Sequence, residues 1–219
     1  MPRRLNLPDS ASVATPDSGG KLFAPSAARN SEPLTQALTP FVPPSGRALE
    51  IASGTGQHVV AYAQAFPGTQ WQPTEVDPNR ITSIAAYLAE AALSNVQAPI
   101  LLDATAPGWS LHTGPVDLIL LSNLLHLISQ PEAEVLISEA AQALAPGGCL
   151  AIYGPFTRDG TLVSDGDVQF DASLRAQDPE LGYKSDTAIR DFGVSRGLKS
   201  RDTIEMPANN LLLTWHAPA

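Results

Sequence analysis

The sequence contains a single cysteine and no long apolar run, and both absences narrow the class of protein. One cysteine among 219 residues, Cys149, excludes an internal disulfide and a zinc site built from several cysteines. Cys149 lies in an apolar stretch, which favours a small buried side chain over a reactive thiol. No apolar run approaches the roughly 18 residues of a membrane-spanning helix, and none follows the basic start Met1-Pro-Arg-Arg as in a signal peptide. We therefore expect a cytoplasmic protein.

Positive charge is also scarce. The chain has 13 lysines and arginines against 22 aspartates and glutamates, a net charge of −9. Residues 51–150 contain one basic residue, Arg80, and eight acidic ones. A protein without a basic stripe is poorly suited to a nucleic-acid backbone, and an acidic segment is repelled by anionic membranes. We expect a small-molecule ligand, no nucleic acid and no membrane, with the oligomeric state left open.

Apolar strand patterns and helical patterns alternate between residues 47 and 153. Such alternation predicts a parallel sheet with right-handed crossovers, beginning with a Rossmann-like βαβαβ unit. Asp77-Pro78 is typical of a helix start, with aspartate as N-cap and proline as first helical residue. The expected strands are residues 47–52, 69–76, 98–102, 116–121 and 149–153, and the expected helices are residues 57–66, 78–92 and 131–144.

The two ends of the chain do not follow this alternation of strand and helix patterns. Residues 1–22 lack periodicity and predict a flexible tail, followed by a single domain over 23–219 that opens with a short helix near 32–38. Residues 154–184 are polar and rich in glycine and proline, which favours a lid-like insertion. A helix at 186–195 and two antiparallel strands, residues 200–206 and 210–216, complete the domain.

A glycine-rich segment, Glu50-Ile-Ala-Ser-Gly-Thr-Gly56, joins the first strand to the first helix of the unit. Glycines at this point let the backbone approach a ligand closely. The dinucleotide fingerprint requires a third glycine three residues later, where this chain has Val59. A nicotinamide-dependent oxidoreductase is therefore disfavoured.

Acidic and amide side chains stand at the ends of the next strands. Asp77 ends the second strand and could hold two ribose hydroxyls, although Glu75 is only two residues away. Asp103 ends the third strand and could accept a bond from an adenine amino group. Ser122-Asn123 ends the fourth. Together with Glu50, this set fits a ligand with adenine, ribose and a cationic tail, and without phosphate.

These residues resemble the motifs of class I S-adenosylmethionine-dependent methyltransferases. The resemblance covers about residues 45–155 and also includes Asp117-Leu-Ile-Leu-Leu-Ser-Asn123 and Leu144-Ala-Pro-Gly-Gly148. It implies an α/β fold: a Rossmann-like sheet of seven strands, the last antiparallel, with helices on both faces.

A narrower resemblance, to a small family of uncharacterised methyltransferase-like proteins of bacteria and animals, reaches both ends of the chain. Its motifs are Ser26-Ala-Ala-Arg-Asn30-Ser-Glu32-Pro33, Gly54-Thr-Gly-Gln-His58, Trp71-Gln-Pro73, Tyr153-Gly-Pro-Phe156, Phe170-Asp-x-x-Leu-Arg175 and Met206-Pro-Ala-Asn-Asn210. The resemblance to this family implies the fold and the cofactor, but it does not indicate which reaction is catalysed.

The superfamily resemblance implies a role for each motif residue. The loop residues Glu50, Ala52, Ser53, Gly54 and Gly56 would hold the amino-acid tail of the cofactor. Asp77 would hold the ribose, Asp103 and Ala104 the adenine, and Ser122 and Asn123 would lie beside the methyl group. Each also has a purely structural interpretation, as a turn glycine or a helix cap.

Residues outside the cofactor motifs are weaker candidates. His126 follows Asn123 and could be the general base, or equally a packed histidine. Asn30, Tyr153, Asn209 and Asn210 are predicted to contact the substrate.

The predicted function is S-adenosylmethionine-dependent methyl transfer to a small molecule, with S-adenosylhomocysteine as product and no metal. The alternative is an inactive cofactor-binding or interaction protein on the same fold. The sequence Ser122-Asn-Leu-Leu-His126 lacks the Asn/Asp-Pro-Pro-aromatic element of enzymes that methylate base or glutamine amino groups, which disfavours that chemistry.

Overall fold

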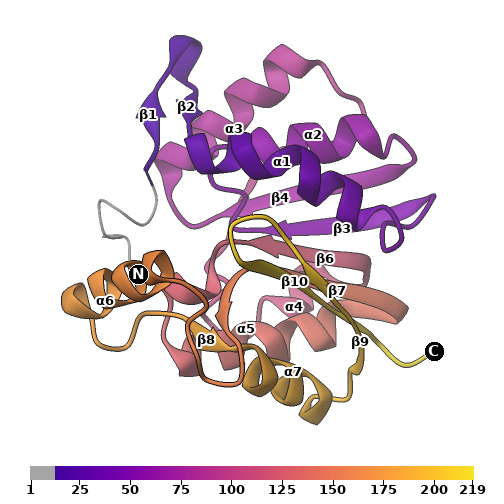
Figure 1. Cartoon of the computed structure of the whole chain (residues 1–219). Helices are drawn as coiled ribbons and strands as arrows, with labels where there is room; N and C mark the ends of the chain where they lie inside the picture. The colour runs from indigo at the N-terminus through magenta and orange to yellow at the C-terminus, as the bar shows by residue number, and fades with distance from the viewer. Residues whose placement is uncertain (1–12) are drawn as a thin grey trace.

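The computed structural model describes residues 13–219, and its centre is a sheet whose main path has seven strands (Figure 1). Adjacent strands from β5 to β7 are parallel, whereas β10 is antiparallel to both β7 and β9. This topology confirms the predicted seven-stranded Rossmann-like methyltransferase fold. The order across the sheet is β5 (Ile100–Leu101), β4 (Thr69–Glu75), β3 (Gly46–Ile51), β6 (Val116–Ser122), β7 (Leu144–Thr157), β10 (Asn210–His216) and β9 (Lys199–Glu205), and a short strand, β8 (Lys184–Ser185), pairs with the end of β7.

Helices cover both faces of the sheet (Figure 1). One face carries α1 (Pro25–Leu38), α2 (Gln57–Ala65) and α3 (Pro78–Ala91), and the other carries α4 (Ser110–Thr113), α5 (Gln130–Ala143) and α7 (Asp186–Ser195). Strand β6 contributes to both cores: Leu118 and Leu120 pack on the α1–α2–α3 side, and Ile119 and Leu121 on the other. A strand buried on both faces needs apolar side chains along its centre, which explains the unbroken apolar run 118–121.

Two helices differ from the expectation. Helix α1 begins at Pro25 rather than near Glu32, because a proline is favourable in the first turn and Pro33 is accommodated within the helix. The segment 154–184 is not a continuous loop: β7 extends to Thr157, and α6 (Asp165–Gln177) follows. Ser164 caps α6 by accepting the Asp167 N–H. The segment that the sequence predicts as a lid-like insertion therefore contains a helix.

The chain before α1 forms a small antiparallel ribbon. Strands β1 (Thr15–Pro16) and β2 (Leu22–Phe23) pair across the short 3-10 helix η1 (Ser18–Gly20), where Gly19 and Gly20 have positive φ. Of the expected flexible tail, residues 1–12 lie outside the described residues, and residues 13–22 belong to this ribbon. The ribbon lies beside α3 (Figure 1).

Cys149 is buried in β7, and burial raises the pKa of its thiol to about 12. This environment confirms the expected unreactive side chain. Within residues 13–219, no helix combines the length and apolar character that crossing a bilayer requires.

Candidate functional site

The carboxyl ends of β3, β4, β5 and β6 meet at one edge of the sheet. From β3 the chain continues through α2 to β4 on one side, and β6 pairs with β3 on the other side. In open α/β sheets, ligands bind in the crevice at such a switch point. The topology therefore gathers the segments that carry Glu50, Asp77, Asp103 and Ser122-Asn123, as the sequence predicts.

The glycine loop after β3 is held in a left-handed conformation. Ala52, Gly54 and Gly56 have φ values of 53°, 62° and 99°. A Cβ atom on Gly56 would lie 2.9 Å from the Ile84 Cα atom in α3, so only glycine fits there without displacing the helix. Ser53 secures the loop, since its N–H donates to the Thr74 carbonyl at 2.8 Å.

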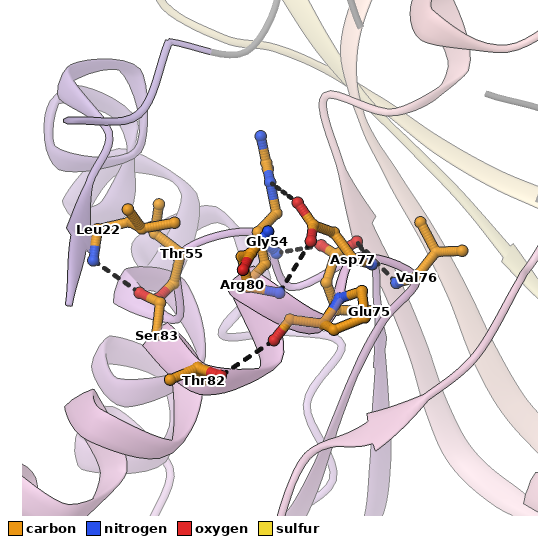
Figure 2. Close-up of polar contacts among 11 residues, drawn as sticks. Leu22, Gly54, Thr55, Glu75, Val76, Asp77, Arg80, Thr82 and Ser83 are labelled. Carbon is orange, nitrogen blue, oxygen red and sulfur yellow. Dashed lines mark hydrogen bonds and ion pairs between the residues drawn. The ribbon is translucent and has the colours of Figure 1, made fainter. Parts of the chain in front are cut away.

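Glu75, which the sequence offered only as a competitor of Asp77, holds this loop from β4. Its Oε2 accepts the Gly54 N–H at 2.9 Å, and its Oε1 accepts the Val76 N–H at 2.8 Å (Figure 2). The side chain is buried, and burial raises the pKa of this carboxyl. Both oxygens of Glu75 are thus occupied, one by the glycine loop and the other by the backbone that leads from β4 to α3.

Asp77 has a different position, at the start of α3. Its Oδ1 caps the helix by accepting the Asn79 N–H at 2.8 Å, which confirms the predicted N-cap. Its Oδ2 lies 3.9 Å from Arg80 Nε, and the side chain is about 31% exposed (Figure 2). Because the capping bond uses only Oδ1, the accessible carboxylate of Asp77 fits a diol better than buried Glu75 does.

Glu50 lies at the end of β3 and is 1% exposed. Its Oε2 atom has no hydrogen-bond partner among the described residues, and the buried hydroxyls of Tyr62 and Ser122 have none beyond each other. Burial raises the pKa of Glu50 to about 7, and burial together with the charge of Glu50 raises that of Tyr62. A buried polar atom without a partner costs free energy that a ligand or water can recover.

Tyr62 was not predicted as a site residue. It lies in α2, in the middle of an apolar pattern, and is fully buried between the rings of His58 and Trp71, with centroids at 5.7 Å and 5.3 Å. Nothing in the local sequence distinguishes it from a core tyrosine. Only the fold shows that its hydroxyl is close enough to Glu50 and Ser122 for mutual electrostatic effects.

Asp103 and Ala104 lie just beyond β5. Asp103 Oδ1 accepts both the N–H and the hydroxyl of Thr105, at 3.0 Å and 2.6 Å, so this carboxylate also stabilises its own turn. Ala104 is buried, and its carbonyl accepts the Trp109 Nε1–H at 3.1 Å. The turn is rigid at the position where the resemblance assigns adenine recognition, and that assignment stays a prediction.

Asn123 follows β6 with a φ of 55°, and its N–H donates to the Tyr153 carbonyl in β7 at 2.8 Å. Tyr153 is buried beside Asn30 of α1; burial raises the pKa of its phenol, and a bond with Asn30 opposes that rise. Asn30 Oδ1 in turn lies 2.7 Å from His58 Nε2. Asn30 and Tyr153, two predicted substrate contacts, are thus neighbours.

His126 lies in a 3-10 turn, η2 (Leu125–Leu127), beneath α6. It is 4% exposed and packs edge-on against Phe170 and Tyr183, with centroids at 5.7 Å and 6.3 Å. Burial and the charge of Lys184 lower the pKa of its imidazole to about 3. The ring is therefore neutral at physiological pH and weakly basic, and its catalytic role stays a prediction.

Asn209 lies in the turn between β9 and β10 and Asn210 begins β10, and both side-chain amides make protein contacts. Asn209 Nδ2 donates to Asp167 Oδ2 at 3.0 Å, which attaches the turn to α6. Asn210 Nδ2 donates to the Pro207 carbonyl at 3.0 Å. Their predicted contact with substrate stays untested, whereas the anchoring of α6 by Asn209 is evident.

The residues described by the structure contain no group of three or more histidine, cysteine or acidic side chains arranged to hold a metal ion.

The fold is similar to that of solved methyltransferases. An O-methyltransferase family protein from Burkholderia thailandensis matches with a TM-score of 0.76 and 17% identity, over 89% of this chain and 58% of that one. Human N-acetylserotonin methyltransferase, solved in complex with SAM, matches with a TM-score of 0.73 and 14% identity, over 89% and 53%. An O-methyltransferase family 2 protein from Planctomyces limnophilus, solved with apigenin, gives 0.69 and 20%, over 85% and 61%.

This chain therefore spans about half to three fifths of the length of these structures, and the likeness establishes the Rossmann-like methyltransferase fold. A family model described as "Protein of unknown function (DUF938)" matches residues 21–217. The chain belongs to this family.

Proposed function

We propose that the protein is an S-adenosylmethionine-dependent methyltransferase that acts on a small molecule. The observation that carries the proposal is the buried, unpartnered Oε2 of Glu50 at the end of β3, close to the buried hydroxyl of Tyr62. A carboxylate in such a position needs a cation or a hydrogen-bond donor to complete it. The α-ammonium group of S-adenosylmethionine has this chemistry.

The other residues of this edge fit the rest of the cofactor. Asp77 keeps an accessible carboxylate for ribose hydroxyls, and Asp103 with Ala104 would hold the adenine. Ala52, Ser53, Gly54 and Gly56 shape the loop beneath the amino-acid tail, while Ser122 and Asn123 lie beside the position of the methyl group. The chemistry that S-adenosylmethionine supplies when bound is an electrophilic methyl group, leaving S-adenosylhomocysteine.

The chain's own contribution is positioning and exclusion of water. Holding a nucleophile in line with a methyl group can supply about 7–11 kcal/mol of rate acceleration. His126, with a pKa of about 3, is too weak a base to deprotonate an alcohol readily. The acceptor class that this favours is a neutral amine or a thiolate, which needs little help from a base.

Calorimetric titration with S-adenosylmethionine and S-adenosylhomocysteine tests the proposal, with NADH as control. We expect saturable binding of both sulfur nucleosides and none of NADH. Incubation with methyl-labelled S-adenosylmethionine and a metabolite extract then separates turnover from binding. Binding without any labelled product would favour the inactive alternative, and absence of binding would refute both.

A further inference from the structure

A cavity of about 530 Å³ lies between the N-terminal ribbon and the first turns of α3. Its described lining comes from two segments that are distant in the sequence. The ribbon contributes Ala14, Gly20 and Leu22, and the start of α3 contributes Asp77, Asn79, Arg80 and Thr82. Because Asp77 is the residue proposed to bind ribose, the cavity adjoins the proposed cofactor site.

A short hydrogen-bond chain connects the ribbon to the glycine loop through one buried hydroxyl. The Leu22 N–H donates to Ser83 Oγ at 2.8 Å, and Ser83 Oγ donates to the Thr55 carbonyl at 2.8 Å (Figure 2). Ser83 is fully buried in α3. The position of the ribbon is therefore tied to a residue inside the glycine loop.

A second connection runs through Gln57, at the start of α2. Its Oε1 accepts the Ala24 N–H at 2.7 Å and the Thr55 hydroxyl at 2.9 Å. Thr55 thus contacts both connections, one through its carbonyl and one through its side chain. Lys21, the residue before Leu22, pairs with exposed Glu90 at 2.7 Å, and its Nζ lies 5.2 Å from the centroid of the Tyr87 ring.

We propose that the ribbon, residues 13–24, forms the outer wall of the subsite for the nucleoside part of the cofactor; this inference rests on the proposed function. The lining from α3 offers a carboxylate, an amide and a hydroxyl, which can bond to the hydroxyls and heteroatoms of a nucleoside. Since Ser83 and Gln57 connect the ribbon to the loop, ordering of either element stabilises the other. Cofactor binding and ribbon docking are thus coupled in both directions.

The test compares full-length wild type with Leu22→Pro, which removes the N–H that Ser83 accepts. Lys21→Ala is the matched control at the adjacent residue, because it keeps the Leu22 N–H and removes the pair with Glu90 and the contact with the Tyr87 ring, neither of which lines the cavity. Calorimetry measures the affinity for S-adenosylhomocysteine and for 5′-methylthioadenosine, which lacks the amino-acid tail. Loss of one buried hydrogen bond predicts affinities about tenfold weaker for both ligands in Leu22→Pro, and about unchanged in Lys21→Ala.

A second measurement follows tryptic cleavage after Lys21 in wild type. We expect S-adenosylhomocysteine to slow this cleavage severalfold, because the bound ligand holds the ribbon down. The ribbon contributes no residue to the buried apolar clusters, so Leu22→Pro should fold, as a thermal melt would check.

Three results would overturn the inference, and they are distinguishable. Unchanged affinity in Leu22→Pro, with wild type binding normally, would remove the ribbon from the site. Weaker binding of S-adenosylhomocysteine alone would place the ribbon against the amino-acid tail. No binding of S-adenosylhomocysteine to wild type at about 1 mM would refute the proposed function and, with it, this inference.

Discussion

The edge of the sheet proposed to bind the cofactor and the region of α6, proposed as a lid, both contain buried acidic side chains, but these differ in their hydrogen-bond partners. At the edge, Glu50 has an oxygen without a partner within residues 13–219. Under the lid, Asp167 accepts hydrogen bonds from Ser164, Tyr183 and Asn209, at 2.7, 3.1 and 3.0 Å. The first arrangement leaves an oxygen for a ligand or water to satisfy, whereas the second is satisfied within the protein.

This difference distinguishes a carboxylate that can bind a ligand from one that stabilises the fold. A carboxylate that has all its donors stabilises the fold and gains nothing from a ligand. A buried carboxylate that lacks a donor destabilises the ligand-free protein and is stabilised on binding. Variants of the two regions should therefore have opposite signatures in stability and in affinity.

The largest expected effect is on the stability of Glu50→Gln. The pKa of Glu50 is raised from 4.5 to about 7 in the folded protein, so the unfolded chain loses this proton at lower pH than the folded chain. The free energy of unfolding therefore falls as the pH rises from about 4.5 to 7. Removing the charge should stabilise the ligand-free protein by about 3 kcal/mol at pH 8 and have no effect below pH 4. Urea unfolding of wild type and variant across this range measures the difference.

Comparing wild type with Glu50→Gln at the same pH controls for the titration of other side chains. His58 and His126 have pKa values lowered to about 4 and about 3, so their contribution to stability falls as the pH drops below 6.5. That contribution is the same in both proteins and cancels. Glu50→Gln should also bind S-adenosylhomocysteine more weakly than wild type. If Glu50→Gln were no more stable than wild type at pH 8, Glu50 would not differ from the satisfied carboxylate of Asp167.

Asp77→Ala should weaken the binding of S-adenosylhomocysteine about 30-fold, or about 2 kcal/mol, because a carboxylate that bonds hydroxyls is lost. Asp77 also caps α3, so alanine costs about 1 kcal/mol of stability as well. Asp77→Ser keeps a capping oxygen and removes the carboxylate. Calorimetry should show a similar loss of affinity for both variants, and normal binding by the serine variant would exclude the ribose role.

Tyr183→Phe tests the hydrogen bonds of Asp167 in α6. The variant removes the hydroxyl that donates to Asp167 Oδ1 at 3.1 Å, and should cost about 1 kcal/mol of unfolding free energy. Its affinity for S-adenosylhomocysteine should stay within about twofold of wild type, because the lid carboxylates are already satisfied. A large loss of affinity at unchanged stability would show that the lid belongs to the binding site.

The smallest effect concerns His126. Its pKa of about 3 predicts that the imidazole stays neutral from pH 5 to 8, so its C2 proton signal in NMR should not shift over that range. A titration with a midpoint near 6.5 would mean that the ring is exposed to solvent, and would restore it as a general base.

Local sequence signals predicted most of the fold. Helix α7 and strand β10 have the expected bounds, since turn residues and periodicity mark both ends. Helix α6 was missed because residues 154–184 are polar and interrupted by glycine. Its start does carry a signal, since Ser164 is followed three residues later by Asp167, a spacing typical of a capped helix.

For the candidate site, the sequence predicted a residue's position only where that position follows from its own strand end, and the roles of these residues stay proposals. The glycine loop and Asp77 are of this kind. The contact of Glu75 with Gly54 joins residues 21 positions apart, and the orientation of a side chain at a strand end is decided by packing. Likewise, the burial of His126 depends on Phe170 and Tyr183, which are supplied by a distant segment.

The antiparallel strand β10 has a consequence for biosynthesis. It lies between β7 and β9, and within residues 13–219 β9 joins the sheet only through it. On the ribosome, β9 therefore emerges before the strand that can receive it, and the β7 edge stays open until residues 210–216 have left the exit tunnel. Nascent chains that stall before this point would present an apolar edge to other chains, which makes them candidates for chaperone capture.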